Sequence, residues 1–249
     1  MIRKLLYGNR RSILYCGLLL WTFFAAGCAT TPAGVNHSDP LEPANRKVYS
    51  FNNSLDRHVL KPMADAYVRV TPLPVQTAVS HFYNNLTYPE VFLNQFLQGK
   101  FILGFSDIGR FIVNSTVGIA GLYDPATHIG LSAHNEDFGQ TLAAWHVPQG
   151  AYVVLPFFGP DTARNTPDIV VSTLTNALFY VGSIYVTLPL GVLGIVNTRA
   201  QVNGTTTLLN QAALDPYVFT RDAYLQHREF LIFDGHPPPR SYDVYDDPQ

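Results

Sequence analysis

Four uncharged polar side chains recur at helical spacing in the least charged part of the chain. At about 100° per residue, Ser172, Asn176, Ser183 and Thr187 fall within an arc of roughly 60°. Hydroxyls and amides hydrogen-bond a polar solute without holding it by charge, so such a row could line a polar passage. Residues 169–198, which carry the pattern, contain no Asp, Glu, Lys or Arg, whereas a surface helix of a soluble protein carries charges on its polar side.

One long amphipathic helix is the element that would align these four side chains. Thr166, Pro167 and Asp168 provide an N-cap hydroxyl, a proline at the first helical position and an acid in the first turn, and Pro189 closes the run. Two interpretations remain open for this helix. It is either a buried core helix whose hydroxyls bond to its own backbone, or a helix with lipid on one side and a polar passage on the other.

The sequence gives little support for a catalytic or metal-binding site. Ser106 follows Gly104-Phe105 but has no second glycine to complete a G-x-S-x-G elbow. A Ser106/His134/Asp137 phospholipase would require the fold to bring these residues together. There is no H-E-x-x-H pattern, and no cysteine joins His134 and Glu136 in a metal set. We therefore predict no catalytic residue, no metal and no cofactor.

The bulk composition suits a protein that meets lipid, or one with an unusually large core. Of 249 residues, 14% are charged and 47% are hydrophobic, against roughly 25% charged in a typical soluble domain. The mean hydropathy is +0.07. The net charge is −2, which gives no electrostatic case for nucleic-acid binding.

The N-terminus has the features of an exported lipoprotein. Four basic residues precede an apolar run at 13–26 that is too short for a comfortable transmembrane anchor. Ala25-Ala26-Gly27-Cys28 resembles a bacterial lipobox, so we expect a signal peptide at 1–27, acyl chains such as palmitate on Cys28, and a small polar tether over 28–38. Conventional cleavage without acylation is the alternative, and Arg10-Arg11 leaves a twin-arginine export route open.

The remainder is predicted to be mainly α-helical, as one domain over 39–233 followed by a flexible tail at 234–249. Predicted helices span 43–57, 62–70, 75–86, 91–97, 101–116, 136–145, 199–211 and 215–233, with a capping box of Thr87 and Glu90 before the fourth. We predict a loop over 118–134 and extended chain over 151–155.

Two further sets of residues are candidates for function. Gly118 and Gly121 would let the following loop move as a gate, or they mark an ordinary turn. Arg46, Arg164 and Arg199 would meet phosphate through their forked guanidinium groups, or they pair with Asp39, Glu42, Asp168 or Asp215 in structural roles.

Several short motifs together resemble the MlaA (VacJ) family of outer-membrane phospholipid-transport lipoproteins. They occur in order from Asp39 to Phe230, behind the lipobox. The matching stretches are DPLE at 39–42, NR at 45–46, FIVNST at 111–116, EDFGQTL at 136–142, LPFFGP at 155–160 with Arg164, TRA at 198–200, DPY at 215–217, RDAY at 221–224 and Phe230.

This resemblance implies a ring-like bundle of amphipathic helices in the outer membrane of a Gram-negative bacterium, anchored at Cys28, around an amphipathic channel. Members remove mislocalised phospholipid from the outer leaflet and pass it to a soluble periplasmic carrier, beside trimeric porins. A structural outer-membrane lipoprotein that binds a partner without moving lipid is the competing hypothesis.

Overall fold

A computed structural model describes residues 39–204 and 213–238. The chain divides into two units, Met1–Pro40 and Leu41–Gln249, and the elements below belong to the second. The predicted signal peptide, Cys28, the tether and most of the predicted tail lie outside the described residues, so those expectations stay predictions.

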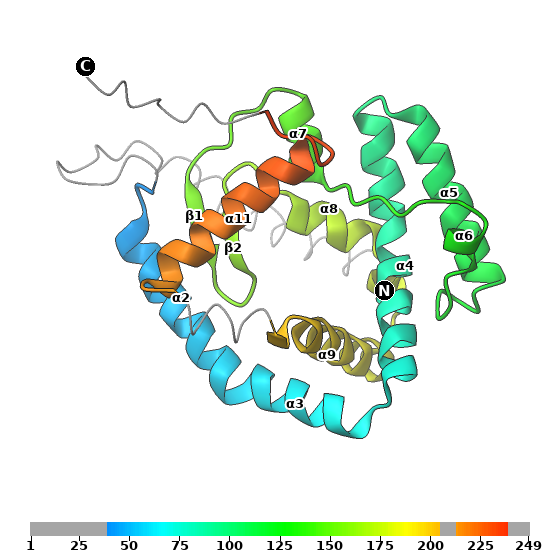
Figure 1. Cartoon of the computed structure of the whole chain (residues 1–249), viewed down its shortest axis with the longest axis horizontal. Helices are drawn as coiled ribbons and strands as arrows, with labels where there is room; N and C mark the ends of the chain where they lie inside the picture. Colours follow the sequence, from blue (N-terminus) through cyan, green and yellow to red (C-terminus); the bar gives the residue numbers. More distant parts are fainter. Residues whose placement is uncertain (1–38, 205–212, 239–249) are drawn as a thin grey trace, which may run out of the picture. The chain divides into compact units, whose positions relative to one another are not determined.

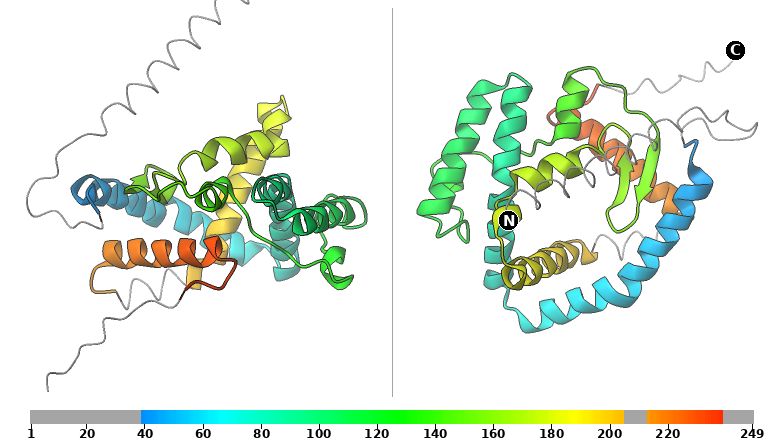
Figure 2. Two further views of the ribbon diagram at one scale, coloured as in Figure 1. Left: turned by 90° about the horizontal axis from the view of Figure 1, so that it is seen from above. Right: turned by 180° about the vertical axis from the view of Figure 1, so that it is seen from behind.

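A continuous run of helix curves along one side of the second unit. α2 (Glu42–Leu55) passes through a π-helical turn, η1 (Asp56–Leu60), directly into α3 (Lys61–Val70). The predicted gap before Pro62 is therefore wrong. Proline has no N–H to donate, and the wider π turn ahead of it accommodates the missing backbone bond. Figures 1 and 2 show this run as the outer curve, with α9 (Ile184–Gln201) on its inner side. There α9 contacts both α3 and α4 (Leu73–Leu97).

α4 (Leu73–Leu97) is one helix where the sequence predicts two. Pro89 lies inside it, and the Thr87 hydroxyl donates 2.8 Å to the Asn84 carbonyl instead of capping a new helix. α4 contacts α5 (Phe101–Thr116), α7, α8 and α9. We attribute its continuity to this packing along its length, which outweighs the local signal for a break.

The middle of the chain holds short elements that match the predictions in part. The predicted loop at 118–134 includes one turn of helix, α6 (Pro125–His128), and α7 (Phe138–Ala144) begins after Asp137. The predicted extended chain is β1 (Tyr152–Leu155), which pairs antiparallel with β2 (Gly159–Thr162). Asn45 of α2 hydrogen-bonds the β1 backbone at Tyr152 and Val154, which joins the hairpin to the outer curve.

The predicted single helix over 169–188 is wrong. The chain instead forms α8 (Asp168–Thr175), a 3₁₀ turn η2 (Ala177–Tyr180) and α9 (Ile184–Gln201). Asn176 causes the first break, because its Oδ1 accepts the N–H of Leu178 at 2.9 Å and so closes a local turn. Pro189, expected to end the helix, lies inside α9.

The final helix agrees with its prediction. α11 (Pro216–Ile232) begins at Asp215, whose carboxylate accepts the N–H groups of Tyr217 and Val218. Residues 199–201 of the helix predicted at 199–211 form the end of α9. Residues 205–212 lie outside the described residues, so the rest of that helix stays a prediction. The described part of the chain is thus mainly α-helical, as the sequence predicts. Within it, no helix is both long and apolar enough to cross a membrane.

Candidate functional site

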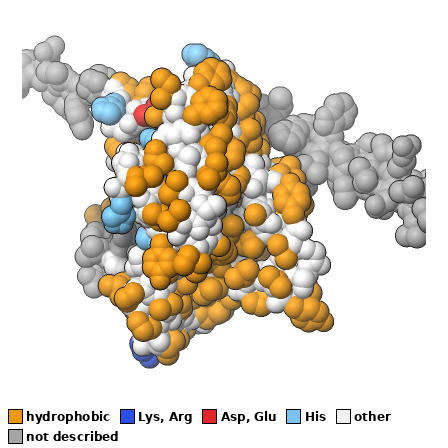
Figure 3. Space-filling model, turned by 90° about the vertical axis from the view of Figure 1, so that its right-hand side faces the viewer, with side chains coloured by type: hydrophobic (Ala, Val, Ile, Leu, Met, Phe, Trp, Pro, Cys, Tyr) orange, Lys and Arg blue, Asp and Glu red, His pale blue; other side chains and the backbone are white. Residues whose placement is uncertain are grey.

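The second unit buries polar side chains and exposes apolar ones. Among its largest fully buried side chains are Gln95, Asn94, Asn197, Thr141 and Asp107. Large hydrophobic side chains are exposed on several helices; Tyr185 is 89% exposed, Ile102 86% and Val70 79%. Figure 3 shows one face on which many hydrophobic side chains are exposed and few charged ones. Soluble domains bury mainly apolar side chains. A polar interior beneath an apolar surface therefore suits a protein with apolar surroundings.

The four polar residues of the predicted stripe fall on three separate pieces of chain. Ser172 lies in α8, Asn176 caps its end, Ser183 precedes α9 and Thr187 lies in its first turn. The register that the sequence assigned to one unbroken helix is therefore wrong.

These four residues nevertheless share a degree of burial. All four are half-buried, whereas their apolar neighbours, such as Leu174, Ile184 and Leu188, are exposed. Two of the side chains bond to the nearby backbone: the hydroxyls of Ser172 and Thr187 donate to the carbonyls of Ile169 and Ser183 at 3.3 and 3.2 Å. The polar residues of this segment are thus less exposed than its apolar ones. Passage lining by these residues stays a prediction.

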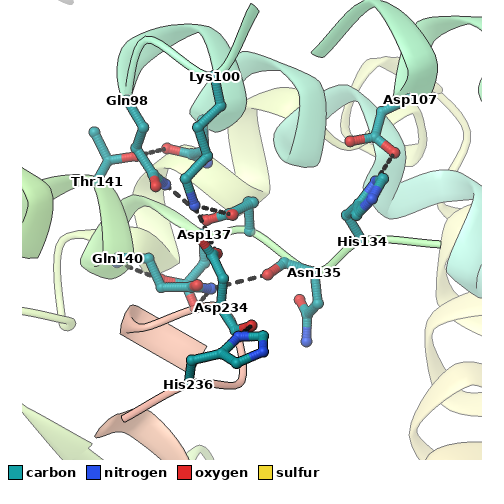
Figure 4. A network of polar contacts seen from close by, with 12 residues as sticks. Gln98, Lys100, Asp107, His134, Asn135, Asp137, Gln140, Thr141, Asp234 and His236 are labelled. Atoms are coloured by element: carbon teal, nitrogen blue, oxygen red, sulfur yellow. Dashed lines mark hydrogen bonds and ion pairs between the residues drawn. The ribbon is translucent and has the colours of Figure 1, made fainter. Parts of the chain in front are cut away.

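A polar network joins the ends of α4 and α11 to the start of α7. Lys100 Nζ lies 2.8 Å from Glu136 Oε1 and 2.6 Å from Asp234 Oδ1. Gln98 donates to Glu136 Oε2 at 2.7 Å, and Glu136 is buried. Figure 4 shows these groups pointing toward one another. The network holds three segments that are far apart in the sequence.

Asp137 anchors α7 to α11. Its Oδ1 accepts the N–H of Gln140 at 2.8 Å, which caps α7, and both of its oxygens accept from Arg228, with Nη2–Oδ1 at 2.9 Å. Burial tends to raise the pKa of Asp137, but the hydrogen bonds and positive charge of Arg228 lower it below its usual value. The acid of the EDFGQTL motif is therefore an ionised structural group.

Glu90 of α4 and Asp168 of α8 lie where those helices contact. Burial, and then the negative charge of Asp168, raise the pKa of Glu90 well above its usual value. The raised pKa favours the neutral carboxyl, which lessens the repulsion between two buried carboxylates. Asp168 also accepts the N–H of Phe138 at 2.7 Å and so connects α8 to α7.

Two of the three candidate arginines have carboxylate partners. Arg46 Nε lies 2.8 Å from Glu42 Oε1, and its Nη2 lies 2.8 Å from Asp215 Oδ2. Arg199 Nη2 donates to Asp56 Oδ2 at 3.0 Å. For Arg46 the observed partners are among the carboxylates that the structural alternative named. Arg199 also forms a structural ion pair, but its partner, Asp56, was not among them.

Arg164 differs from the other two arginines. Its Nη1 donates to the Val147 carbonyl at 3.1 Å, and its buried Nε has no hydrogen-bond partner within the described residues. Burial, then the charge of Arg228, lower its pKa. A phosphate contact for Arg164 stays a prediction.

Gly118 and Gly121 lie in a tight turn between α5 and α6. A Cβ on Gly118 would lie 2.4 Å from the Asn114 carbonyl oxygen. Gly121 has a φ of +86°, and a Cβ there would lie 2.5 Å from the Cβ of Asn85. Glycine is needed here for close packing against α4. A gating role for this turn stays a prediction.

The residues of the hypothetical phospholipase are not assembled. His134 Nδ1 shares a 2.8 Å hydrogen bond with Asp107 Oδ1 (Figure 4), not with Ser106. Asp137 is held by Arg228. Within residues 39–204 and 213–238, no group of three or more His, Cys, Asp or Glu side chains has the geometry to hold a metal ion.

A polar cavity of about 380 Å³, which the sequence analysis missed, lies beside α4 and α5. Its wall includes Tyr88 and Asn85 of α4, Arg110 of α5, and His134. Arg110 is held by Tyr88 Oη, Thr127 Oγ1 and the Leu131 carbonyl, and by Asp124 Oδ2 at 2.5 Å. Burial tends to raise the pKa of Asp124, but hydrogen bonds from Thr127, Asn114 and Arg110 lower it to about 2. The signal in the sequence was Arg110 within a helix of mixed apolar and polar residues.

Comparison with known protein families identifies the family of this chain. The family model described as MlaA lipoprotein matches residues 37–231. The chain belongs to the MlaA lipoprotein family, which confirms the resemblance found in the sequence.

Relatives are similar over most of their length. The proteins named intermembrane phospholipid transport system lipoprotein MlaA from Shigella flexneri and Escherichia coli are 35% and 34% identical to this chain over 232 residues, which are 90% of each chain. A solved structure reported under "Structural basis for maintenance of bacterial outer membrane lipid asymmetry" superposes with a TM-score of 0.69 at 34% identity. It covers 79% of this chain and 100% of its own.

Proposed function

We propose that this protein is an outer-membrane lipoprotein that removes mislocalised phospholipids from the outer leaflet. It passes them along a polar passage within the helical unit to a soluble periplasmic lipid carrier. This retrograde transport maintains the lipid asymmetry of the outer membrane. The names of the relatives in Shigella flexneri and Escherichia coli support this assignment.

One observation carries the proposal: the polar interior and apolar exterior of the second unit. Transfer of the exposed apolar side chains from water into a bilayer is favourable, by roughly 25 cal/mol per Å² removed from water. A charged headgroup at mid-bilayer costs about 2.5–3.5 kcal/mol on insertion scales. Inward-facing hydroxyls and amides lower that cost, while the acyl chains can remain in hydrocarbon.

Several finer points belong to the same proposal. The helices form a ring-like bundle embedded in the outer membrane, anchored by acyl chains on Cys28 and held beside a porin trimer. Ser172, Asn176, Ser183 and Thr187 line the passage, and their half-buried positions support this role. The protein is not an enzyme; the engagement of His134 with Asp107 and of Asp137 with Arg228 supports this.

The test compares leucine substitutions on the two sides of the same segment. Asn176→Leu and Ser183→Leu remove half-buried polar groups, while Thr173→Leu, in α8 on the exposed side, is the matched control. In cells with equal protein levels, phospholipid in the outer leaflet, measured by surface labelling, should rise for the first two variants only. A wild-type lipid distribution in both would contradict their role in a passage.

A further inference from the structure

Three adjoining cavities lie on the face formed by α4, α5 and α6. The polar cavity of about 380 Å³ borders an apolar one of about 440 Å³, and a second apolar one measures about 320 Å³. His81 lines all three, and Tyr123 lies between the two apolar cavities. One polar chamber therefore opens beside two apolar grooves, an arrangement that matches one polar head and two hydrocarbon chains.

The polar chamber contains hydrogen-bonding groups that a ligand can use. Asn85 is 4% exposed, and its Oδ1 is buried without a hydrogen-bond partner among the described residues. The Tyr88 hydroxyl accepts from Arg110 Nε and retains its own hydrogen to donate. His134 uses Nδ1 toward Asp107, which leaves Nε2 for the chamber. A buried acceptor without a partner is destabilising, so a ligand that donates to Asn85 would restore the missing hydrogen bond.

The fixed charges of the chamber balance. Arg110 supplies one positive charge and Asp124 one negative charge, and they lie in contact at the chamber wall. A zwitterionic headgroup, with a phosphate and an ammonium, can place each of its charges beside the opposite one. An anionic headgroup would meet Asp124 without an ammonium to offset it.

The two apolar grooves lie on a surface that is itself apolar. Val117 and Ile129 line the larger groove and are 71% and 65% exposed, and Leu73 lines the smaller one and is 72% exposed. Figure 3, which looks onto this side of the protein, shows hydrophobic side chains around the histidines. Acyl chains in these grooves would be continuous with surrounding hydrocarbon.

We propose that this face binds one diacyl phospholipid with a zwitterionic, phosphoethanolamine-type headgroup. The headgroup occupies the polar chamber beneath His81, and the chains occupy the two grooves on either side of Tyr123. This inference rests on the proposed function, because it treats phospholipid as the cargo. It adds a defined holding site on the outer side of α4 and α5.

The first test blocks the point where the three cavities meet. Purified full-length protein in lipid-free detergent is titrated with phosphatidylethanolamine, and bound lipid is counted by native mass spectrometry. His81→Trp should lower the affinity by about tenfold or more, while His227→Trp, at an exposed position on α11, should bind like wild type. Equal binding by both variants would overturn the site.

A second pair of variants keeps the test independent of folding effects near His81. Ile129→Asp places a charge in a groove at an exposed position, and Ile195→Asp makes the same change at a 55% exposed position on α9. Only the first should weaken lipid binding. Equal weakening by both would overturn the groove assignment.

Two further ligands, one without acyl chains and one with an anionic headgroup, test the ligand chemistry. Chain-free glycerophosphoethanolamine should fail to displace the bound lipid, and phosphatidylglycerol should bind more weakly than phosphatidylethanolamine. Displacement by the former would show a headgroup site without chains, and equal binding of the latter would contradict zwitterion selection.

The outer-leaflet assay separates this site from the proposed function. Unchanged lipid binding by His81→Trp, together with outer-leaflet accumulation in cells lacking the protein, would remove the site and leave transport standing. Loss of binding in His81→Trp, with normal outer-leaflet lipid in cells lacking the protein, would support the site and contradict transport.

Discussion

Replacing Arg228 with methionine should remove the strongest fixed link between α11 and α7. The Arg228 and Asp137 side chains are 9% and 18% exposed and form a two-point ion pair. Removing one partner of a buried pair typically costs about 3–5 kcal/mol, because the other charge stays buried. At about 2–4 °C per kcal/mol for a chain of this size, the thermal midpoint should fall by roughly 6–20 °C.

The fluorescence of Trp145 is a suitable reporter of this change. Trp145 ends α7, donates from Nε1 to the Leu97 carbonyl at 3.1 Å and packs edge-on against Phe138. Thermal unfolding of wild type, Arg228→Met, Asp137→Asn and the double variant completes a mutant cycle. Asn still caps a helix, so the double variant should lose less stability than the sum of the single ones, by about 0.5–3 kcal/mol.

The same pair predicts a pH dependence. The pKa of Asp137 is lowered in the folded protein, so its contribution is present above the unfolded pKa, near 3.9, and disappears as the pH falls through the folded value. Wild type should therefore lose stability below about pH 4 more steeply than Arg228→Met. Additive single effects, or identical acid profiles, would refute the reasoning that the pair closes α11 onto α7.

Two remaining predictions concern the anchor and the α5–α6 turn. Cys28→Ala should release the protein from the outer-membrane fraction, because an acylated cysteine contributes about 0.8 kcal/mol per buried CH₂; Cys16→Ala, within the predicted signal peptide, should not, and unchanged membrane retention of Cys28→Ala would count against lipidation. Gly121→Ala should destabilise the protein by about 2–5 kcal/mol, since it combines a left-handed backbone with a clash against Asn85. Gly99→Ala, at φ +78° with open space around it, should cost only about 1–2 kcal/mol. Equal losses in thermal unfolding would mean that the turn does not pack against α4 and is free to move.

Helices with local start signals were predictable from the sequence. Asp215 before Pro216 and Asp137 before Phe138 cap α11 and α7 in the way their residue types indicate. The continuity of α4 across Pro89 was not predictable, because its cause is packing against helices distant in sequence.

The candidate site, too, was predictable where it depends on local sequence and not where it depends on packing between distant segments. Polar side chains at 172, 176, 183 and 187 are all half-buried, but Asn176 bonds locally and breaks the helix that would have aligned them. The cavity at Arg110 depends on the approach of α4, α5 and the segment around His134. No periodic pattern within one element encodes such an approach. The second strand, Gly159-Pro160-Asp161-Thr162, has three residue types that are depleted in strands before Thr162 and is defined by its pairing with β1.

The polar interior has a thermodynamic consequence. Unfolding a typical globular domain exposes apolar surface and raises the heat capacity by about 12–15 cal/mol/K per residue, while exposed polar surface lowers it. Unfolding of this protein in detergent would hydrate asparagines, glutamines and ion pairs, such as Asn94, Gln95 and Arg228, that the folded unit buries. Its stability curve should therefore be unusually flat with temperature, with little tendency toward cold denaturation.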